Sequence, residues 1–188
     1  MMCTGWPRFL LTGVAALCAV PHATFADVRL PAVFGSHMVL QRDVELPVWG
    51  WAEPGEVVTV SLDGHADKAT ADAEGRWQVT LHPMKADGKP HTLSVAGKNK
   101  IKLEDVLVGE VWVGSGQSNM EWPMTATMNP QAAIAAASHP QIRLFHVPKV
   151  QAPAPANDVN ASWKVCTPET VPQFSCGLYY FGVERRQE

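Results

Sequence analysis

The chain has 188 residues, of which 46% are hydrophobic and 18% are charged, and its formal net charge is −3. A chain of this length can bury a core without relying on disulfides, and it accommodates one domain or two small ones. Its isoelectric point near 6.1 argues against bulk binding to nucleic acid, because no excess of basic residues is present to neutralise phosphates.

Residues 1–26 have the composition of a secretory signal peptide. This segment has no acidic residue, one basic residue at Arg8, and an apolar run, FLLTGVAALCAV, over residues 9–20. The run is shorter than the ~20 residues that a membrane-spanning helix needs, and small residues end the segment at Ala26. We expect cleavage near Ala26, a secreted or periplasmic mature protein, and no membrane span; a buried N-terminal helix is the alternative.

Residues 28–105 have the pattern of a β-rich domain. Apolar and polar residues alternate in short runs between Gly, Pro and Asp turns, and no gap is long enough for a crossover helix. The expected strands cover residues 38–40, 46–51, 57–62, 77–81 and 91–96. Strands at this spacing predict an antiparallel β-sandwich.

Three tryptophans of this region, Trp49, Trp51 and Trp77, allow two interpretations. They could form an exposed platform on which sugar rings stack, or they could fill the core. Aromatic side chains supply much of the apolar area of a small β-domain, so the core interpretation is favoured.

The pattern changes at residue 106. The run VLVGEVWVG at 106–114 is nearly continuously apolar, which is typical of a strand buried on both faces. Asn129 and Pro130 have the residue types of a helix start. The other expected elements are a helix over 131–138, a strand over 142–147, a Pro-rich loop over 151–160, a strand over 161–166 and a helix from 174 to about 187. This alternation predicts an α/β domain over residues 106–188.

The chemistry of this second region centres on Ser118, which follows the expected strand and lies close to Gly116. A serine at the carboxyl end of a buried strand is where α/β folds place nucleophiles, and Gly116 lets the backbone turn sharply. The backbone amides of Ser118 and Asn119 are candidate donors to an oxyanion. A polar turn without catalysis is the alternative, because the G-x-S-x-G motif fails at Met120.

Four segments resemble one known family. They are GEVWVGSGQSNMEWP at 109–123, RLPAVFGSHMVLQRD at 29–43, PVWGWAEPGEVVTV at 47–60 and WKVCTPETVPQFS at 163–175. All four are similar to segments of the sialate O-acetylesterases, which belong to the SGNH hydrolase superfamily. The resemblance implies a β-sandwich followed by a flavodoxin-like three-layer α/β domain, with a serine that takes an acetyl group from a sugar ester. It implies no metal and no cofactor.

Carried over by position, the resemblance makes Ser118 the nucleophile, with its own N–H in the oxyanion hole. Gly116, Gln117 and Asn119 take oxyanion or positioning roles. The family supplies its base and orienting acid from a late D-x-x-H block, and no Asp is followed three residues later by His in this sequence. We therefore expect an N-terminal fragment of an esterase, with a truncated α/β domain and very low activity by itself.

Three further questions stay open at this point. The substrate could be acetylated xylan or another carbohydrate instead of a sialic acid. A secreted β-sandwich that binds glycan without catalysis is a hypothesis of another class. Cys166 and Cys176 could form a disulfide in an oxidising compartment, although two thiols are the favoured interpretation.

Overall fold

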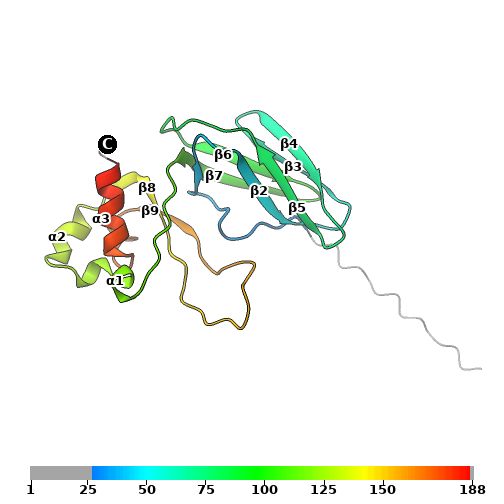
Figure 1. Ribbon diagram of the computed structural model, residues 1–188. Helices are drawn as coiled ribbons and strands as arrows, with labels where there is room; N and C mark the ends of the chain where they lie inside the picture. The colour runs from blue at the N-terminus through cyan, green and yellow to red at the C-terminus, as the bar shows by residue number, and fades with distance from the viewer. Residues whose placement is uncertain (1–26, 187–188) are drawn as a thin grey trace, which may run out of the picture.

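The computed structural model describes residues 27–186, so the predicted signal peptide at 1–26 lies outside the described residues. These residues form a β-rich unit and a smaller unit of helices and two strands (Figure 1). The strands of the first unit are β1 (Val39–Gln41), β2 (Leu46–Trp51), β3 (Val57–Leu62), β4 (His65–Thr70), β5 (Arg76–Leu81), β6 (His91–Ala96) and β7 (Lys100–Gly109). The smaller unit holds α1 (Ser118–Glu121), the 3₁₀ turn η1 (Met124–Ala126), α2 (Pro130–Ala135), β8 (His139–Phe145), β9 (Trp163–Cys166) and α3 (Cys176–Arg185).

Five strands of the first unit form one mixed sheet in the order β1-β7-β6-β3-β4. The β7–β6, β6–β3 and β3–β4 pairs are antiparallel, whereas β1 runs parallel to β7, with Val39 opposite Leu107. The expectation of a purely antiparallel unit is therefore wrong at this edge. The long excursion through β2 to β6 separates β1 from β7, and a parallel pair needs such a connection.

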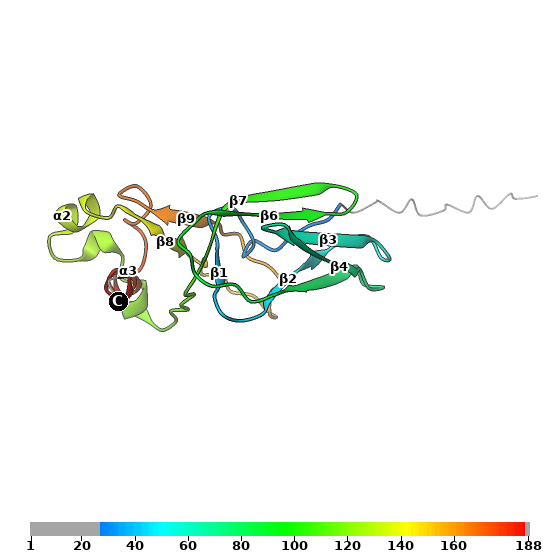
Figure 2. The same ribbon diagram turned by 90° about the horizontal axis from the view of Figure 1, so that it is seen from above.

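The remaining two strands of the first unit, β2 and β5, form an antiparallel pair with Val48 opposite Val79. Figure 2 shows β6 and β7 at one side of the unit and β2 at the other. Side chains from the pair and from the five-stranded sheet fill one shared hydrophobic cluster, in which Val48, Val60 and Val95 are fully buried. Period-two alternation along each strand produces this arrangement, because every second side chain points into the cluster.

The predicted strands at 46–51, 57–62, 77–81 and 91–96 are confirmed within one residue. β4 was not expected, since its sequence, HADKAT, has no apolar alternation and its side chains are almost all exposed. It forms as the second arm of a hairpin whose turn, Asp63-Gly64, has positive φ at both residues.

The three tryptophans do not form one surface. Trp77 is 3% exposed and lies in the core, as predicted, whereas Trp49 is 40% exposed on the opposite face of the β2–β5 pair. Trp49 packs edge-on against Phe34, and Arg29 lies over the ring of Trp51. The core interpretation is thus confirmed for Trp77 and wrong for Trp49.

β7 runs through residue 106, at which the sequence predicts the start of a separate strand and domain. Val106 and Val108 are buried in the cluster of the first unit. The strand ends at Gly109, and Val113 is 89% exposed, so the expected strand over 106–114 is wrong beyond Gly109. The apolar run over 106–114 therefore spans two environments. Its first residues are buried in the core of the first unit, and its later residues are exposed.

Gly50 in β2 marks a close approach of two backbone segments. Arg29 lies beside this part of β2, where Arg29 and Trp51 exchange backbone hydrogen bonds of 2.8 and 2.9 Å. A Cβ atom at Gly50 would lie 2.2 Å from the Arg29 carbonyl oxygen and 3.0 Å from the Trp77 ring. Only glycine fits between these groups.

Replacing Gly50 by alanine is expected to lower the free energy of unfolding by about 2 kcal/mol, the cost typical of overpacking against an atom that cannot move away. Thermal and urea unfolding of the 188-residue chain measure this loss. Gly109→Ala is the matched control, because a Cβ there would meet only Val39, at 3.5 Å. Equal losses in the two variants would contradict the packing argument.

The smaller unit has a core of its own, to which Met124, Leu144, Cys166 and Tyr179 contribute. The expected helix over 131–138 is shorter than predicted, and Asn129 precedes it in a left-handed conformation without capping it through its side chain. The expected strands at 142–147 and 161–166 are found as β8 and β9. They form an antiparallel pair, and β8 already begins at His139. Within residues 27–186 no helix is long and apolar enough to cross a bilayer.

The two cysteines of the smaller unit are free thiols, as favoured. Cys166 is fully buried on β9, and burial raises the pKa of its thiol to about 11. A thiol in such a site stays protonated and unreactive.

A partly buried ion pair joins the two units. Arg143 on β8, whose side chain is 4% exposed, donates to both carboxylate oxygens of Asp105 on β7, at 2.6 and 3.1 Å. His37 lies 2.7 Å from the same carboxylate. Trp163 adds a hydrogen bond of 2.8 Å from its indole nitrogen to the Val33 carbonyl. The sequence motifs did not indicate this junction.

Candidate functional site

Ser118 is the first residue of α1, and the segment 110–117 that joins it to β7 has no regular structure. Gln117 precedes it in an extended conformation, and its carbonyl accepts a hydrogen bond of 2.9 Å from the Met120 amide. Gly116, Gln117, Ser118 and Asn119 are all exposed. The chain thus presents the predicted site residues together on one exposed turn.

Helix α3 holds this turn in place. Gly114 packs directly on Leu178, and a Cβ atom at Gly114 would lie 2.4 Å from that side chain. Trp112 meets Phe181 edge-on at 5.0 Å, and the Ser175 hydroxyl donates to the Met120 sulfur at 3.6 Å.

The start of α3 is also tied to the end of α1 through backbone groups, because the Cys176 amide donates to the Trp122 carbonyl at 2.9 Å. Ser175 itself caps α3 by accepting from the Leu178 amide. The position of Ser118 therefore depends on α3, which the sequence predicts as a helix but does not connect to the site.

The Ser118 hydroxyl makes no hydrogen bond to any other residue in the range 27–186. Neither histidine that follows it serves as its partner. His139 lies 3.3 Å from the Tyr179 hydroxyl and 3.0 Å from Arg186, and burial, followed by the charge of Arg186, lowers its pKa. His139 is the first residue of β8.

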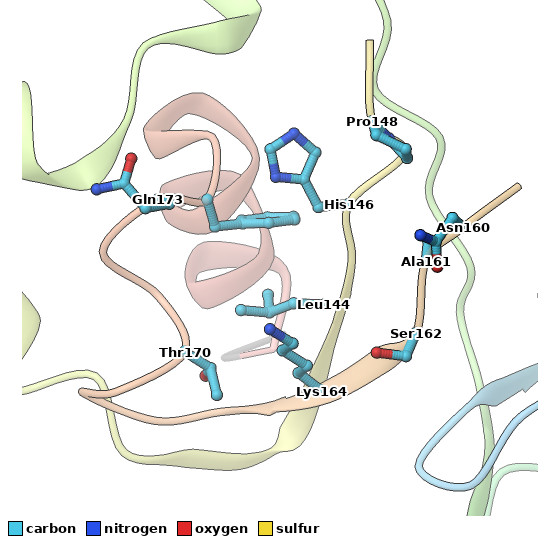
Figure 3. A pocket seen from close by; sticks show the side chains of 10 residues that line it. Leu144, His146, Pro148, Asn160, Ala161, Ser162, Lys164, Thr170 and Gln173 are labelled. Carbon is cyan, nitrogen blue, oxygen red and sulfur yellow. The ribbon is translucent and has the colours of Figure 1, made fainter. Parts of the chain in front are cut away.

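His146, the second of these histidines, follows β8 and packs edge-on against Phe174. It lines a hollow of about 440 Å³ formed by the ends of β8 and β9 and by the segment before α3 (Figure 3). The motifs of the sequence did not point to this hollow. One sequence feature lies beside this hollow, namely Lys164, a charged residue within the expected strand over 161–166.

Glu121, at the end of α1, forms an ion pair with Lys149. This pair connects the helix of Ser118 to the loop that follows β8. Among residues 27–186 no group of three or more His, Cys, Asp or Glu side chains could hold a metal ion. The chemistry that the described residues can supply at this turn is a serine hydroxyl, backbone N–H donors and the amides of Gln117 and Asn119.

Two curated proteins are similar in sequence to most of this chain. The chain is 31% identical to the sialate O-acetylesterase of Mus musculus over 151 residues, which cover 72% of this chain and 28% of the mouse protein. It is 30% identical to that of Homo sapiens over 161 residues, covering 76% and 30%. The chain therefore spans less than a third of the length of these curated relatives. No family model matches it.

One solved structure is similar in both sequence and fold. The crystal structure of a novel carbohydrate acetylesterase from Xanthomonas citri matches with a TM-score of 0.82 and 40% identity. The match covers 85% of this chain and 37% of that protein.

Proposed function

Because the chain belongs to the sialate O-acetylesterase family, we propose that it carries the nucleophile of an enzyme that removes O-acetyl groups from sugars. The observation that carries the proposal is the place of Ser118, which is exposed at the first position of a helical turn after β7. Its neighbours Gly116, Gln117 and Asn119 leave the hydroxyl accessible to an ester.

In the proposed reaction the Ser118 Oγ attacks the acetyl carbonyl carbon as its proton passes to a base. The tetrahedral oxyanion accepts hydrogen bonds from the Ser118 backbone N–H, with Gln117 and Asn119 as positioning residues. The intermediate collapses to an acetyl-serine and releases the sugar hydroxyl, which takes up a proton. Water then attacks the acetyl-serine, and acetate leaves while Ser118 regains its proton.

Neither His139 nor His146 makes a hydrogen bond to Ser118 within the described residues, so neither is proposed as the base. The family resemblance places it in the D-x-x-H block, together with the acid that orients it. A serine without its base keeps only a residual part of the rate, so the chain by itself is proposed to be a weak esterase.

Two other functions are alternatives to this proposal. A broader carbohydrate acetylesterase, acting on acetylated xylan or another polysaccharide, is favoured by the likeness to the carbohydrate acetylesterase of Xanthomonas citri. Comparing turnover of acetylated xylan and O-acetylated sialic acid by the natural gene product separates these substrates. A glycan-binding protein without catalysis would bind acetylated sugars but release no acetate.

The proposal extends to the organisation of the chain. Residues 28–105, together with the end of β7, are proposed as a β-sandwich, and the rest as the start of a three-layer α/β domain. Residues 1–26 are proposed as a signal peptide cleaved near Ala26, which makes the mature protein secreted or periplasmic. N-terminal sequencing of the protein from culture medium or periplasm tests the cleavage site.

Trapping the covalent intermediate tests the nucleophile directly. The natural gene product, mixed with p-nitrophenyl acetate and quenched in acid within one turnover, is expected to carry one acetyl group on Ser118 in peptide mass mapping. An acetyl group found on a different serine, or none where acetate is released in a steady state, would contradict the assignment.

A further inference from the structure

The segment that joins β7 to the Ser118 turn depends on other parts of the chain for its path. Residues 110–117 form neither a helix nor a strand (Figure 1), and all of them except Gly114 are exposed. A segment with few buried contacts and no regular hydrogen bonds moves easily unless other groups hold it. The later half of the segment packs on α3 through Trp112 and Gly114, so the question is what holds the first half.

The first half is held by β1, where a glutamine side chain takes over from the backbone ladder. The Arg42 amide donates to the Gly109 carbonyl at 2.9 Å, which continues the β1–β7 pair by one residue. In a parallel pair the Arg42 carbonyl would also accept from the Val111 amide. The Gln41 side chain occupies this step instead. Its Oε1 accepts from the Val111 amide at 2.8 Å, and its Nε2 lies 3.4 Å from the Arg42 carbonyl.

The same glutamine also binds the side chain of Glu110. Its Nε2 donates to Glu110 Oε2 at 3.0 Å, while the Nε of Arg42 donates to Oε1 at 2.7 Å. The hydrogen bonds from Gln41 and Arg42, followed by the charges of Arg42 and of Arg185 on α3, lower the pKa of Glu110. We refer to Gln41, Arg42 and Glu110 as the polar clamp. Both oxygens of its carboxylate are bonded by residues at the end of β1.

The polar clamp joins two of the segments that the sequence singles out. Gln41 and Arg42 belong to RLPAVFGSHMVLQRD at 29–43, and Glu110 belongs to GEVWVGSGQSNMEWP at 109–123. The proposed hydrolysis gives the first of these segments no role. The side chains of Arg42 and Glu110 are 46% and 47% exposed, so solvent weakens their attraction and the pair adds little to stability. The clamp therefore affects the direction of the segment more than the stability of the fold.

We propose that Gln41 is a positioning residue for Ser118. By binding the Val111 amide and the Glu110 carboxylate together, it fixes the direction in which the chain leaves β7 and thereby the place of the nucleophile turn. This inference rests on the proposed function of Ser118. Gln41 acts through residues 110–117 and not on the ester, so its loss lowers kcat and leaves KM nearly unchanged, because misplacing a nucleophile slows the chemical step.

Kinetics of the natural gene product on p-nitrophenyl acetate test the proposal. Gln41→Met keeps the length of the side chain but removes its acceptor and its donor. We expect kcat to fall about tenfold, with KM within about twofold of the wild type. Gln78→Met is the matched control, because Gln78 is an exposed glutamine on β5, and it is expected to change neither constant. Equal kinetics in the two variants would overturn the inference.

Exchanging the two clamp groups separates positioning from a general loss of stability. Gln41→Glu keeps an acceptor for the Val111 amide but places a second carboxylate against Glu110, and this repulsion is expected to lower kcat as far as Gln41→Met does. Adding Glu110→Gln to Gln41→Glu restores one amide and one carboxylate in the reverse order. The double variant is expected to recover most of kcat. A double variant no faster than Gln41→Glu would overturn the inference.

Amide measurements on the 188-residue chain report the positioning without catalysis. In Gln41→Met the Val111 amide is expected to exchange with solvent about tenfold faster, because its acceptor is gone. The amide resonances of Ser118, Asn119 and Met120 are expected to shift as well, while those of the β2–β5 pair stay in place. Shifts confined to the neighbours of residues 41 and 111 would overturn the inference. Thermal unfolding confirms that the variant is folded.

The proposed function has its own control. Hydrolysis that persists in Ser118→Ala would overturn the proposed function, and the amide shifts would then decide whether Gln41 positions the turn. Hydrolysis that depends on Ser118 but not on Gln41 would overturn this inference alone.

Discussion

Replacing Ser118 by alanine is expected to lower acetyl ester hydrolysis by the natural gene product by at least about ten-thousand-fold. The alanine removes the atom that forms the acetyl-enzyme, and removing a nucleophile from an assembled catalytic group costs the rate contribution of the whole group. The exposed position of Ser118, whose hydroxyl has no structural hydrogen bond in the described chain, means that the fold should not change. Steady-state rates on p-nitrophenyl acetate and on an O-acetylated sugar measure the loss.

The matched control for this prediction is Ser138→Ala. Ser138 is also exposed and lies between α2 and β8, away from the proposed nucleophile turn. Its replacement is expected to leave both rates within twofold of the wild type, on the order of normal variation among surface substitutions. Retention of more than a tenth of the activity in Ser118→Ala would contradict the assignment of the nucleophile.

The second large effect is expected at the junction of the two units. Replacing Arg143 by methionine keeps most of its aliphatic volume but leaves the Asp105 carboxylate with His37 as its remaining side-chain partner. Breaking a buried ion pair from one side is strongly destabilising. Because the Asp105 side chain is 34% exposed, solvent reduces this penalty to about 3 kcal/mol. Urea unfolding of the 188-residue chain at neutral pH measures it.

Arg76→Met is the control for Arg143. Arg76 donates to Asp72 and Glu74, but its side chain is 65% exposed, so a much smaller loss of stability is expected. Similar losses in the two variants would show that the junction does not depend on the buried pair.

The same carboxylate predicts a dependence of stability on pH. Arg143 lowers the pKa of Asp105 from 3.8 to about 2. The folded state therefore binds this proton less readily than the unfolded state, so the stabilisation is present above pH 3.8 and is lost as the pH falls through about 2. In Asp105→Asn, this part of the decrease in stability between pH 4 and pH 2 is expected to disappear. An unchanged slope would rule out Asp105 as its source.

Much of the β-rich unit was predictable because local alternation determines it. β2, β3, β5 and β6 each place every second side chain in one core, so period-two patterns indicated them. β4 has no such pattern, and its pairing depends on the turn before it. The parallel β1–β7 contact depends on two segments about 68 residues apart, which no local pattern records.

The site was predictable only in part, for a similar reason. Gly116, Gln117, Ser118 and Asn119 are adjacent in sequence, so their exposure on one turn follows from local chemistry. The supports of the turn are distant, since Leu178 contacts Gly114 across more than 60 residues. The pairing of Arg143 with Asp105 also escaped prediction, because an arginine within an apolar strand indicates a buried partner but does not identify it.

β7 makes the two parts of the protein depend on each other. The strand fills the first core with Val106 and Val108, and the segment beyond it stays attached to β1, because the Val111 amide donates to the Gln41 side chain at 2.8 Å. From there the chain runs on to Ser118 along α3. Ser118, the proposed nucleophile, thus follows directly on β7, a strand of the β-rich unit. Under the proposed mechanism, a substitution in that core that displaces β7 is expected to reduce catalysis at Ser118 before the protein unfolds.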